Sequence, residues 1–208
     1  MMLSYFIHAL ISVFAVLNPL GILPTFLAIT DGKHPIERRR IARKAIVYSF
    51  FIVLMFLLLG HLILTLFGIT IEAFRVAGGI LVFFIAFQLL NAQPSHIQTP
   101  HEDESQPKPD ITLTPLALPI IAGPGTIATV MALAAGPNIL MHSAAVFIAC
   151  VIVLAGTYCI FHYASSINRY IGHTGLNVIT RLMGFILTII AVQMAATGLV
   201  GLFPGWAH

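Results

Sequence analysis

Six long apolar segments, separated by polar stretches, follow one another along the chain. Their approximate limits are residues 3–29, 45–67, 73–90, 115–135, 144–163 and 178–202. Segments of about twenty apolar residues have the length at which an α-helix crosses a ~30 Å hydrocarbon core. None alternates apolar and polar positions as a membrane β-strand does. The pattern therefore predicts an all-α membrane protein with six transmembrane helices.

The composition supports this class and excludes several others. Of 208 residues, 59% are hydrophobic and only 8% are charged, and the mean hydropathy is +0.99. Ordinary soluble domains carry about 25% charged residues. Soluble enzymes, nucleic-acid-binding proteins and disordered proteins are therefore excluded as first interpretations. The net charge of +3 does not indicate a nucleic-acid partner, because the few Lys and Arg residues sit mainly in one cluster.

The distribution of cations predicts the orientation in the membrane. All Lys and Arg except Arg75 fall between segments one and two, three and four, or five and six, with Arg181 at the start of segment six. The connection between segments three and four, residues 93–112, is rich in Pro, acidic residues and Ser, which is typical of a flexible linker. The positive-inside rule places these three connections in the cytoplasm and both termini outside. The first segment lacks a preceding cationic region and a clear cleavage site, so we expect a retained helix.

The two halves of the sequence resemble each other. The pattern R-x-x-G-x-I-L occurs at Arg75–Leu81 and again 106 residues later at Arg181–Leu187. Asn18–Gly21 reads NPLG and Gly123–Thr126 reads GPGT, with their prolines 105 residues apart. Each half holds three segments, so the second half enters the membrane from the opposite side, as in many secondary transporters. The predicted organisation is two inverted three-helix repeats, residues 1–92 and 113–208, joined by the linker 93–112.

The paired Pro and Gly residues predict breaks in the first and fourth helices. Pro19 and Pro124 lack an N–H and interrupt the helical hydrogen-bond pattern. Inside a bilayer, unsatisfied backbone groups must be buried in protein or line a wet cavity. A helix that restarts there offers N–H groups and a positive dipole end to a carboxylate. The carbonyls left behind suit a cation, so an amino-acid zwitterion would match both.

The candidate substrate site consists of residues at these two breaks. The residues are Asn18, Pro19, Gly21, Gly123, Pro124, Gly125, Thr126 and Thr129. A single break of this kind is more often a packing feature, and a single Thr more often bonds its own helix backbone. Two breaks at matching positions of an inverted repeat favour the binding interpretation.

Other polar residues in or near the segments leave alternatives open. Asp and Glu all lie in connections or at segment ends, which argues against a carboxylate proton relay. His61 and His162 are interfacial or internally bonded residues, or else proton carriers. Gln88 and Gln193 lie in helix interfaces or reach the cavity. Arg75 and Arg181 cap the opposite helix or pair across the repeat, with Glu72 as a local candidate partner of Arg75, or else they act in gating.

Sequence motifs for enzyme chemistry and metal binding are missing. The nine His residues show no H-x-x-x-H or H-E-x-x-H spacing, and neither a Walker motif nor a G-x-S-x-G elbow occurs. We therefore expect no enzymatic activity, no metal and no cofactor.

Several stretches resemble the MarC family of bacterial inner-membrane proteins. They are NPLGILPTFLAIT (18–30), LFGITIEAFRVAGGILVFFIAFQLL (66–90), PLALPIIAGPGTIATV (115–130), GLNVITRLMGFIL (175–187) and GLFPG (201–205). The resemblance covers nearly the whole chain apart from the linker. It implies a six-span inner-membrane protein of a family also classed as small neutral amino acid transporters.

The combined expectation is a secondary transporter of a small neutral amino acid such as glycine or alanine. The substrate would bind at the two breaks near the midplane, and a proton or sodium gradient would drive its movement. Two other functions stay open. One is a flippase for a lipid carrier, or an exporter of another small solute, because helix N-termini also bind phosphate. The other is a structural subunit of a larger membrane complex.

Overall fold

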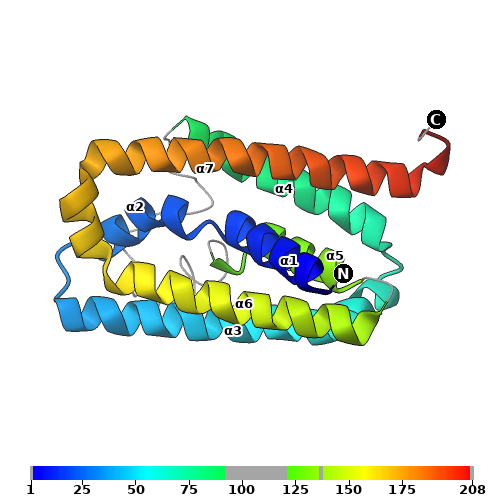
Figure 1. Cartoon of the computed structure of the whole chain (residues 1–208), viewed down its shortest axis with the longest axis horizontal. Coiled ribbons are helices and arrows are strands. Elements are labelled where there is room, and N and C mark those ends of the chain that lie inside the picture. The colour runs from blue at the N-terminus through cyan, green and yellow to red at the C-terminus, as the bar shows by residue number, and fades with distance from the viewer. Residues whose placement is uncertain (1, 92–120, 136–137, 207–208) are drawn as a thin grey trace, which may run out of the picture.

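The structure, a computed structural model, describes residues 2–91, 121–135 and 138–206 (Figure 1). All regular elements in these ranges are helical. They are α1 (Met2–Leu17), α2 (Pro19–Ile29), α3 (Pro35–Leu66), α4 (Ile71–Leu90), α5 (Pro124–Ala134), α6 (Ile139–His162), α7 (Ala164–Leu202) and the short 3-10 helix η2 (Pro204–Trp206).

Five helical stretches are long and apolar enough to cross a membrane. They are Met2–Ile29, which combines α1 and α2, then Pro35–Leu66, Ile71–Leu90, Ile139–His162 and Thr174–Leu202. Helix α5 is apolar but has only 11 residues, which is about 16 Å of helix and too short to span. The all-helical membrane class is thus confirmed. The linker 93–112 and the first residues of the predicted fourth segment lie outside the described residues.

Large apolar side chains on the long helices point away from the protein. Leu58 and Leu66 on α3 are 70% and 74% exposed, and Phe84 and Phe185 on α4 and α7 are each 57% exposed. Contiguous apolar surface of this extent is unusual on a soluble monomer. These faces are suited to contact with lipid chains.

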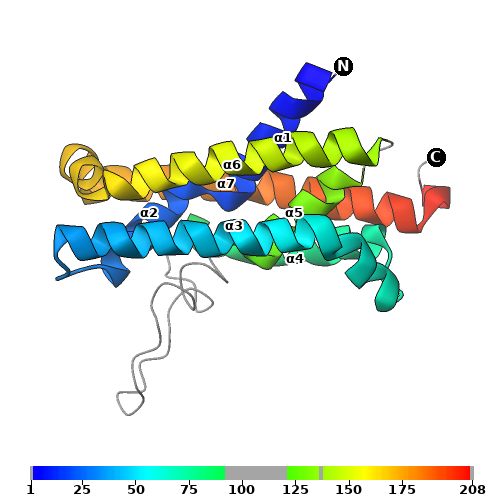
Figure 2. The same cartoon turned by 90° about the horizontal axis from the view of Figure 1, so that it is seen from below.

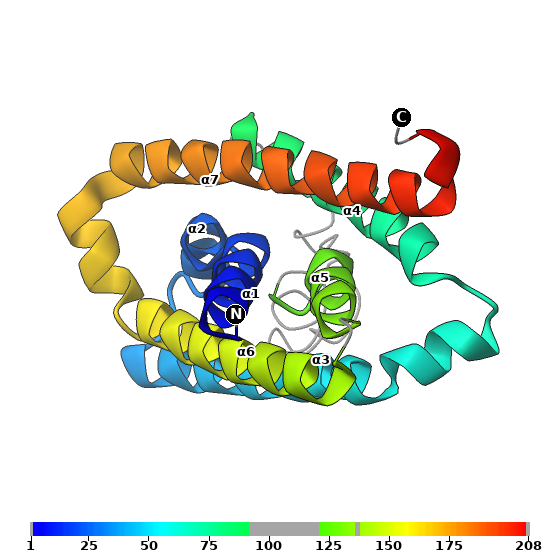
Figure 3. The same ribbon diagram turned by 45° about the vertical axis from the view of Figure 1, so that its right-hand side comes forward.

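The helices form two outer pairs around a central group (Figures 1 and 3). Helices α3 and α6 lie side by side, α4 packs along α7, and α1, α2 and α5 lie between the pairs. The start of α1, the end of α7, the α3–α4 connection, the end of α5 and the start of α6 lie toward one end of the bundle, here called the terminal end. The α2–α3 and α6–α7 connections lie at the other end, here called the basic end (Figure 2).

The basic end takes its name from the cations at the start of α3. The hydrophobic pattern predicts a connection up to residue 44, but α3 begins at Pro35, so five cations lie on the helix: Arg38, Arg39, Arg40, Arg43 and Lys44. Proline at the first helical position is preorganised for helix, and Arg and Lys are good helix formers.

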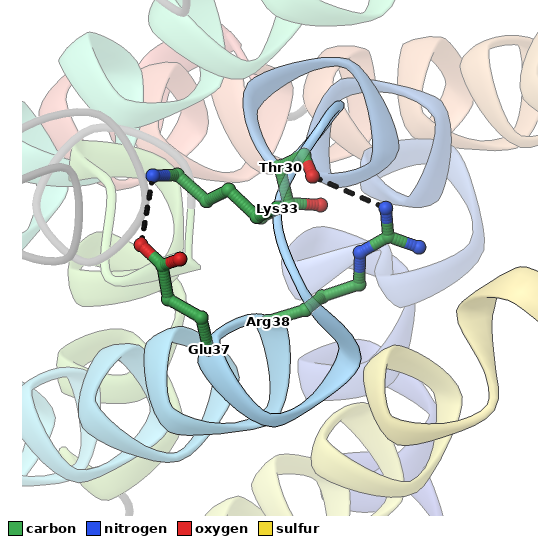
Figure 4. Close-up of polar contacts among 4 residues, drawn as sticks. All are labelled: Thr30, Lys33, Glu37 and Arg38. Carbon is green, nitrogen blue, oxygen red and sulfur yellow. Dashed lines mark hydrogen bonds and ion pairs between the residues drawn. The ribbon is translucent and has the colours of Figure 1, made fainter.

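Two polar contacts order the chain around the start of α3 (Figure 4). Lys33 forms an ion pair with Glu37, with Nζ 2.9 Å from Oε1. Arg38 reaches back and donates from Nη2 to the carbonyl oxygen of Thr30 at 3.1 Å. The arginine thereby ties α3 to the end of α2.

Helices α4 and α7 approach each other closely at Gly79, Gly184 and Gly198, and the first two form a matched pair. A Cβ atom added to Gly79 would lie 2.8 Å from two backbone atoms of α7, and one added to Gly184 would lie about as close to two backbone atoms of α4. The atoms are Ala191 O and Ala195 N for Gly79, and Ala86 O and Leu90 N for Gly184. Every residue of the first contact has its counterpart in the second 105 positions away in the chain. The glycine of the predicted R-x-x-G motif in the first half, Gly78, is one residue away and instead faces Ala128 and Met194.

Candidate functional site

The predicted break in the first membrane helix occurs at Asn18. This residue has φ 50° and ψ 58° and separates α1 from α2. It is the one non-glycine residue with positive φ among those that the structure describes. Asparagine tolerates this left-handed conformation better than most residues, because its short polar side chain can bond locally. Its Oδ1 accepts a hydrogen bond from the Gly21 N–H at 3.1 Å and so caps α2.

Gly21 is required by this cap. A Cβ atom at residue 21 would lie 2.2 Å from Asn18 Nδ2 and 2.7 Å from Oδ1, so a larger residue would displace the capping side chain. Pro19 occupies the first turn of α2, where its missing N–H leaves no helical bond unmade. The three residues therefore build the break together.

The second break, at the start of α5, is built differently. Gly123 is the N-cap residue in extended conformation, Pro124 follows it, and no side chain caps the helix. Thr126 is buried and donates from Oγ1 to the carbonyl oxygen of Ile121 at 3.0 Å. The hydroxyl thus satisfies one carbonyl ahead of the helix, while the first turn of α5 has no side-chain cap.

The two breaks meet at one small cavity of about 30 Å³. Its lining residues come from five helices, from Asn18 between α1 and α2, and from Gly123 before α5. They are Val16, Leu17, Asn18, Ile22, Val82, Ile85, Leu89, Gly123, Gly125, Thr126 and Leu187. The volume has room for no more than a water molecule or two. The structure thus brings together Asn18, Gly123, Gly125 and Thr126, as the repeat suggested.

Gly125 allows α4 to close the side of this cavity. A Cβ atom on Gly125 would lie 2.2 Å from Val82 Cγ2 and 3.5 Å from Val16 Cγ1. Val82, Val16 and Leu187 are buried in one apolar cluster. The close approach of α4 to the break therefore depends on the missing side chain at residue 125.

Four of the predicted site residues do not line the cavity. Pro19, Gly21 and Pro124 shape the two breaks from beside it. Thr129 lies one turn further along α5, and its Oγ1 is 3.8 Å from Met194 Sδ on α7. In this conformation Thr129 faces a helix interface.

The apolar walls were missed by sequence reasoning. Val16, Val82, Ile85 and Leu187 carry no signal that separates them from other aliphatic residues of their helices. Their role depends on how α4 and α7 pack against the breaks.

The two short helices are each capped at their C-terminal end by an arginine. Arg75 donates from Nη2 to the carbonyl oxygen of Ala132 at 3.1 Å, in the last turn of α5. Arg38 does the same at Thr30, the residue that ends α2. A cation at a helix C-terminus is favourable because the unpaired carbonyls carry partial negative charge. The expectation that Arg75 caps another helix is confirmed.

The remaining candidate polar residues lie away from the small cavity. His162 contacts the rings of Tyr158 and Tyr163, with ring centroids 5.8 and 4.8 Å away. Gln193 is exposed and donates to Thr197 Oγ1 at 3.4 Å, so it faces outward. Gln88 is half-buried near the end of α4.

His61 lines a second, larger cavity of about 440 Å³. This cavity lies at the terminal end, between the end of α3, the starts of α4 and α6, and the C-terminal end of α5. Its lining residues are Phe56, Leu57, His61, Leu64, Thr65, Ile69, Thr70, Ile71, Glu72, Met131, Ala134, Ala135, Ile139 and Ser143.

Comparison with known proteins gives matches over almost the full length. Residues 3–203 match the family described as MarC family integral membrane protein. The UPF0056 membrane protein YvbG of Bacillus subtilis is 55% identical over 98% of both chains. A UPF0056 membrane protein of Aquifex aeolicus is 38% identical over 95% of this chain and 93% of its own, and YhcE of Escherichia coli is 34% identical over 94% and 92%. No solved structure gives a significant match.

Proposed function

The chain belongs to the MarC family of integral membrane proteins, and we propose that it is a secondary transporter of a small neutral amino acid, built from two inverted halves. The observation that carries the proposal is the meeting of both helix breaks at one cavity. Broken helices whose ends face a common cavity are the usual way in which transporters hold substrate without charged side chains in the bilayer.

The inverted repeat is supported by a constant offset of 105 residues. Helix α2 runs from Pro19 to Ile29 and α5 from Pro124 to Ala134, so both bounds are shifted by this number. The glycine contacts between α4 and α7 repeat at the same offset. In those contacts Gly79 meets residues 191 and 195, whereas Gly184 meets residues 86 and 90. The two helices therefore run antiparallel, as a two-fold axis in the membrane plane requires.

The polar groups at the cavity suit a carboxylate. Asn18 uses Oδ1 to cap α2, which leaves its Nδ2 hydrogens as donors. The first turn of α5 adds backbone N–H groups and the positive end of the helix dipole. Val16, Val82 and Leu187 enclose the remaining space, so a short uncharged side chain is favoured. Glycine is larger than the present cavity, and α5 or α4 must therefore move when it binds.

The orientation and driving force complete the proposal. The cations at the start of α3 support a cytoplasmic position of the basic end by the positive-inside rule, with the protein in the inner (cytoplasmic) membrane. Both chain ends then face outward. A proton or sodium gradient would drive the movement of the amino acid.

Reconstitution tests the proposal directly. Purified protein in liposomes should take up labelled glycine and alanine faster than protein-free liposomes when an inward proton or sodium gradient is applied. Thr126→Val, which removes the hydroxyl beside the cavity, should reduce uptake severalfold. Thr197→Val is the matched control, because this Thr is exposed and bonds only within α7. Uptake equal to that of empty liposomes would reject the amino acid substrate.

A further inference from the structure

The larger cavity has the size and position of an access route to the helix breaks. Its volume of about 440 Å³ lies within the range of ~300–1,000 Å³ typical of ligand sites. Ala134 and Ala135, at the C-terminal end of α5, line the larger cavity, and Gly125 and Thr126, at its N-terminal end, line the small one. The two cavities therefore lie at opposite ends of one short helix.

The polar groups of the larger cavity favour a cation. Glu72 contributes the carboxylate in its lining, beside His61 and Ser143. The C-terminal end of α5 adds partial negative charge. The nearby cation Arg75 does not line the cavity but bonds the Ala132 carbonyl oxygen. The other walls are mostly apolar, so the cavity suits an ammonium group on a small organic body.

The offset of 105 identifies the equivalent positions at the basic end. Four residues that line the cavity have as counterparts three residues at the end of α2 and the start of α3 and one residue near the end of α6. The pairs are Phe56 with Phe161, Met131 with Phe26, Ala135 with Thr30, and Ser143 with Arg38.

At the basic end three of these counterparts are buried and closely packed. The rings of Phe26 and Phe161 stack with centroids 4.3 Å apart and an interplanar angle of 1°, and both are fully buried. Thr30 is 0% exposed, whereas its counterpart Ala135 is exposed. Arg38 crosses this region, bonding the Thr30 carbonyl oxygen and the hydroxyl of Ser165.

A difference between the two halves explains the closure. Helix α3 continues without a break to Leu66. The equivalent stretch of the second half ends as α6 at His162, and a new helical segment starts at Ala164 and kinks at Gly172, with φ 72°. This segment crosses the basic end at an angle to α6 (Figures 1 and 3). It carries Ser165 to the guanidinium of Arg38.

We propose that the larger cavity admits a small solute with an ammonium group from the terminal end, and that Phe26, Phe161 and Arg38 close the equivalent path at the basic end. This inference rests on the proposed transport function and adds the side from which this conformation is open. It also assigns Glu72 as the residue that selects the charge.

Cysteine labelling of the full chain in liposomes tests the inference without any transport. The native thiols are first removed by Cys150→Ala and Cys159→Ser, and gel filtration verifies folding. Ala135→Cys and its counterpart Thr30→Cys are then exposed to membrane-impermeant methanethiosulfonates carrying either a trimethylammonium or a sulfonate group. The labelling rate of each variant with each reagent is divided by the rate of the same reagent with a free thiol in solution, which corrects for the different reactivities of the reagents. Ser143→Cys serves as a second reporter in the cavity.

The expected pattern has three parts. Relative to a free thiol, Ala135→Cys reacts about fivefold faster with the cationic reagent and about fivefold slower with the sulfonate reagent, the factor that a unit charge about 4 Å away gives in water. Glu72→Gln removes this preference. Thr30→Cys stays unreactive from both sides until Arg38→Ala is added.

Three results would overturn the inference. They are unreactive thiols at both residues 135 and 143, equal rates for the two reagents, and labelling of Thr30→Cys while Arg38 is intact. The outcome is separable from that of glycine uptake. Failed uptake with the expected labelling rejects the proposed amino acid substrate and leaves the access route standing. Successful uptake with any of the three contrary labelling results rejects only the access route.

Discussion

Asn18 combines two roles that most residues cannot perform together. It adopts a left-handed backbone conformation and caps α2 through its side chain. The left-handed conformation costs most L-residues about 1–2 kcal/mol, and loss of a cap to Ala costs about 1 kcal/mol. Asn18→Ala should therefore destabilise the protein by about 2–3 kcal/mol. Asn18→Gly should cost much less, since Gly accepts positive φ and is only slightly worse as a cap.

Thermal unfolding of the two variants in the same detergent tests whether Asn18→Ala loses more stability than Asn18→Gly. Both substitutions remove the Asn18 amide group from the cavity, so they change the site by a similar amount and differ mainly in the backbone conformation that they favour. Equal loss of stability in Asn18→Ala and Asn18→Gly would show that the backbone conformation at residue 18 is not the source of the effect.

Gly125 gives a second prediction at the residue scale. Gly125→Ala places a Cβ 2.2 Å from Val82 Cγ2, and overpacking of this kind costs about 1–3 kcal/mol. Transport and thermal stability should both fall. Adding Val82→Ala removes the clashing methyl group and should restore part of both. Gly156→Ala is the control, because nothing lies within 4 Å of its added Cβ. Absence of any rescue in the double variant would contradict the contact.

The breaks could be predicted from single residues, but the cavity walls could not. Pro19 and Pro124 could each mark the start of a new helix, because proline has no N–H to continue a preceding helix but fits the first helical turn. Val82 becomes part of the site only because α4 packs on Gly125. The sequence around residue 82 does not indicate that contact.

At the scale of elements, α5 depends on Arg75 for its C-terminal cap. The donated bond to Ala132 joins α4 to a helix that has few turns of its own. Arg75→Met should lower stability by about 1 kcal/mol, within the range for cations at helix C-termini. Arg39→Met, at an exposed position of α3, should change it little. Thermal unfolding in detergent compares the stability of the two variants, and equal losses of stability would argue against a capping role of Arg75.

The contact between α4 and α7 provides a test of the inverted repeat, because its two halves should contribute equally to stability. Gly79 and Gly184 make equivalent backbone contacts, so Gly79→Ala and Gly184→Ala should cost similar free energy, about 1–3 kcal/mol each. Unfolding midpoints measured side by side provide the comparison, with Gly156→Ala as the unstrained reference. A large cost at one glycine and none at the other would contradict the two-fold relation.

The bounds of a helix agree with the hydrophobic pattern where the helix lies within lipid, and they differ from it where the helix ends in water or inside the protein. The predicted third segment, 73–90, agrees with α4 at Ile71–Leu90. Helix α3 begins ten residues before the predicted segment, because a cationic helix start can extend past the bilayer into water. Helix α5 is shorter than a spanning segment because Gly123 and Pro124 start it inside the protein.

At the scale of the whole molecule, residues 105 positions apart lie at opposite ends of the bundle and differ in packing. One end holds a cavity of about 440 Å³ and the other holds stacked Phe26 and Phe161. If the halves exchange these conformations during transport, loosening the closed end should shift the population toward a state open at the basic end.

Phe161→Ala is the change that tests this exchange. Truncating a buried Phe removes about 3–5 kcal/mol of packing, here from the contact that holds the basic end closed. The labelling rate of Ala135→Cys should then fall at least about twofold, because the cavity at the terminal end is open in a smaller fraction of molecules. Phe56→Ala is the matched control at the equivalent position of the other half. Phe56 lines the open cavity and is only half-buried, so its truncation should leave that rate unchanged or raise it. A fall in both variants would point to general loosening of the fold, and a fall in neither would mean that the two ends open independently.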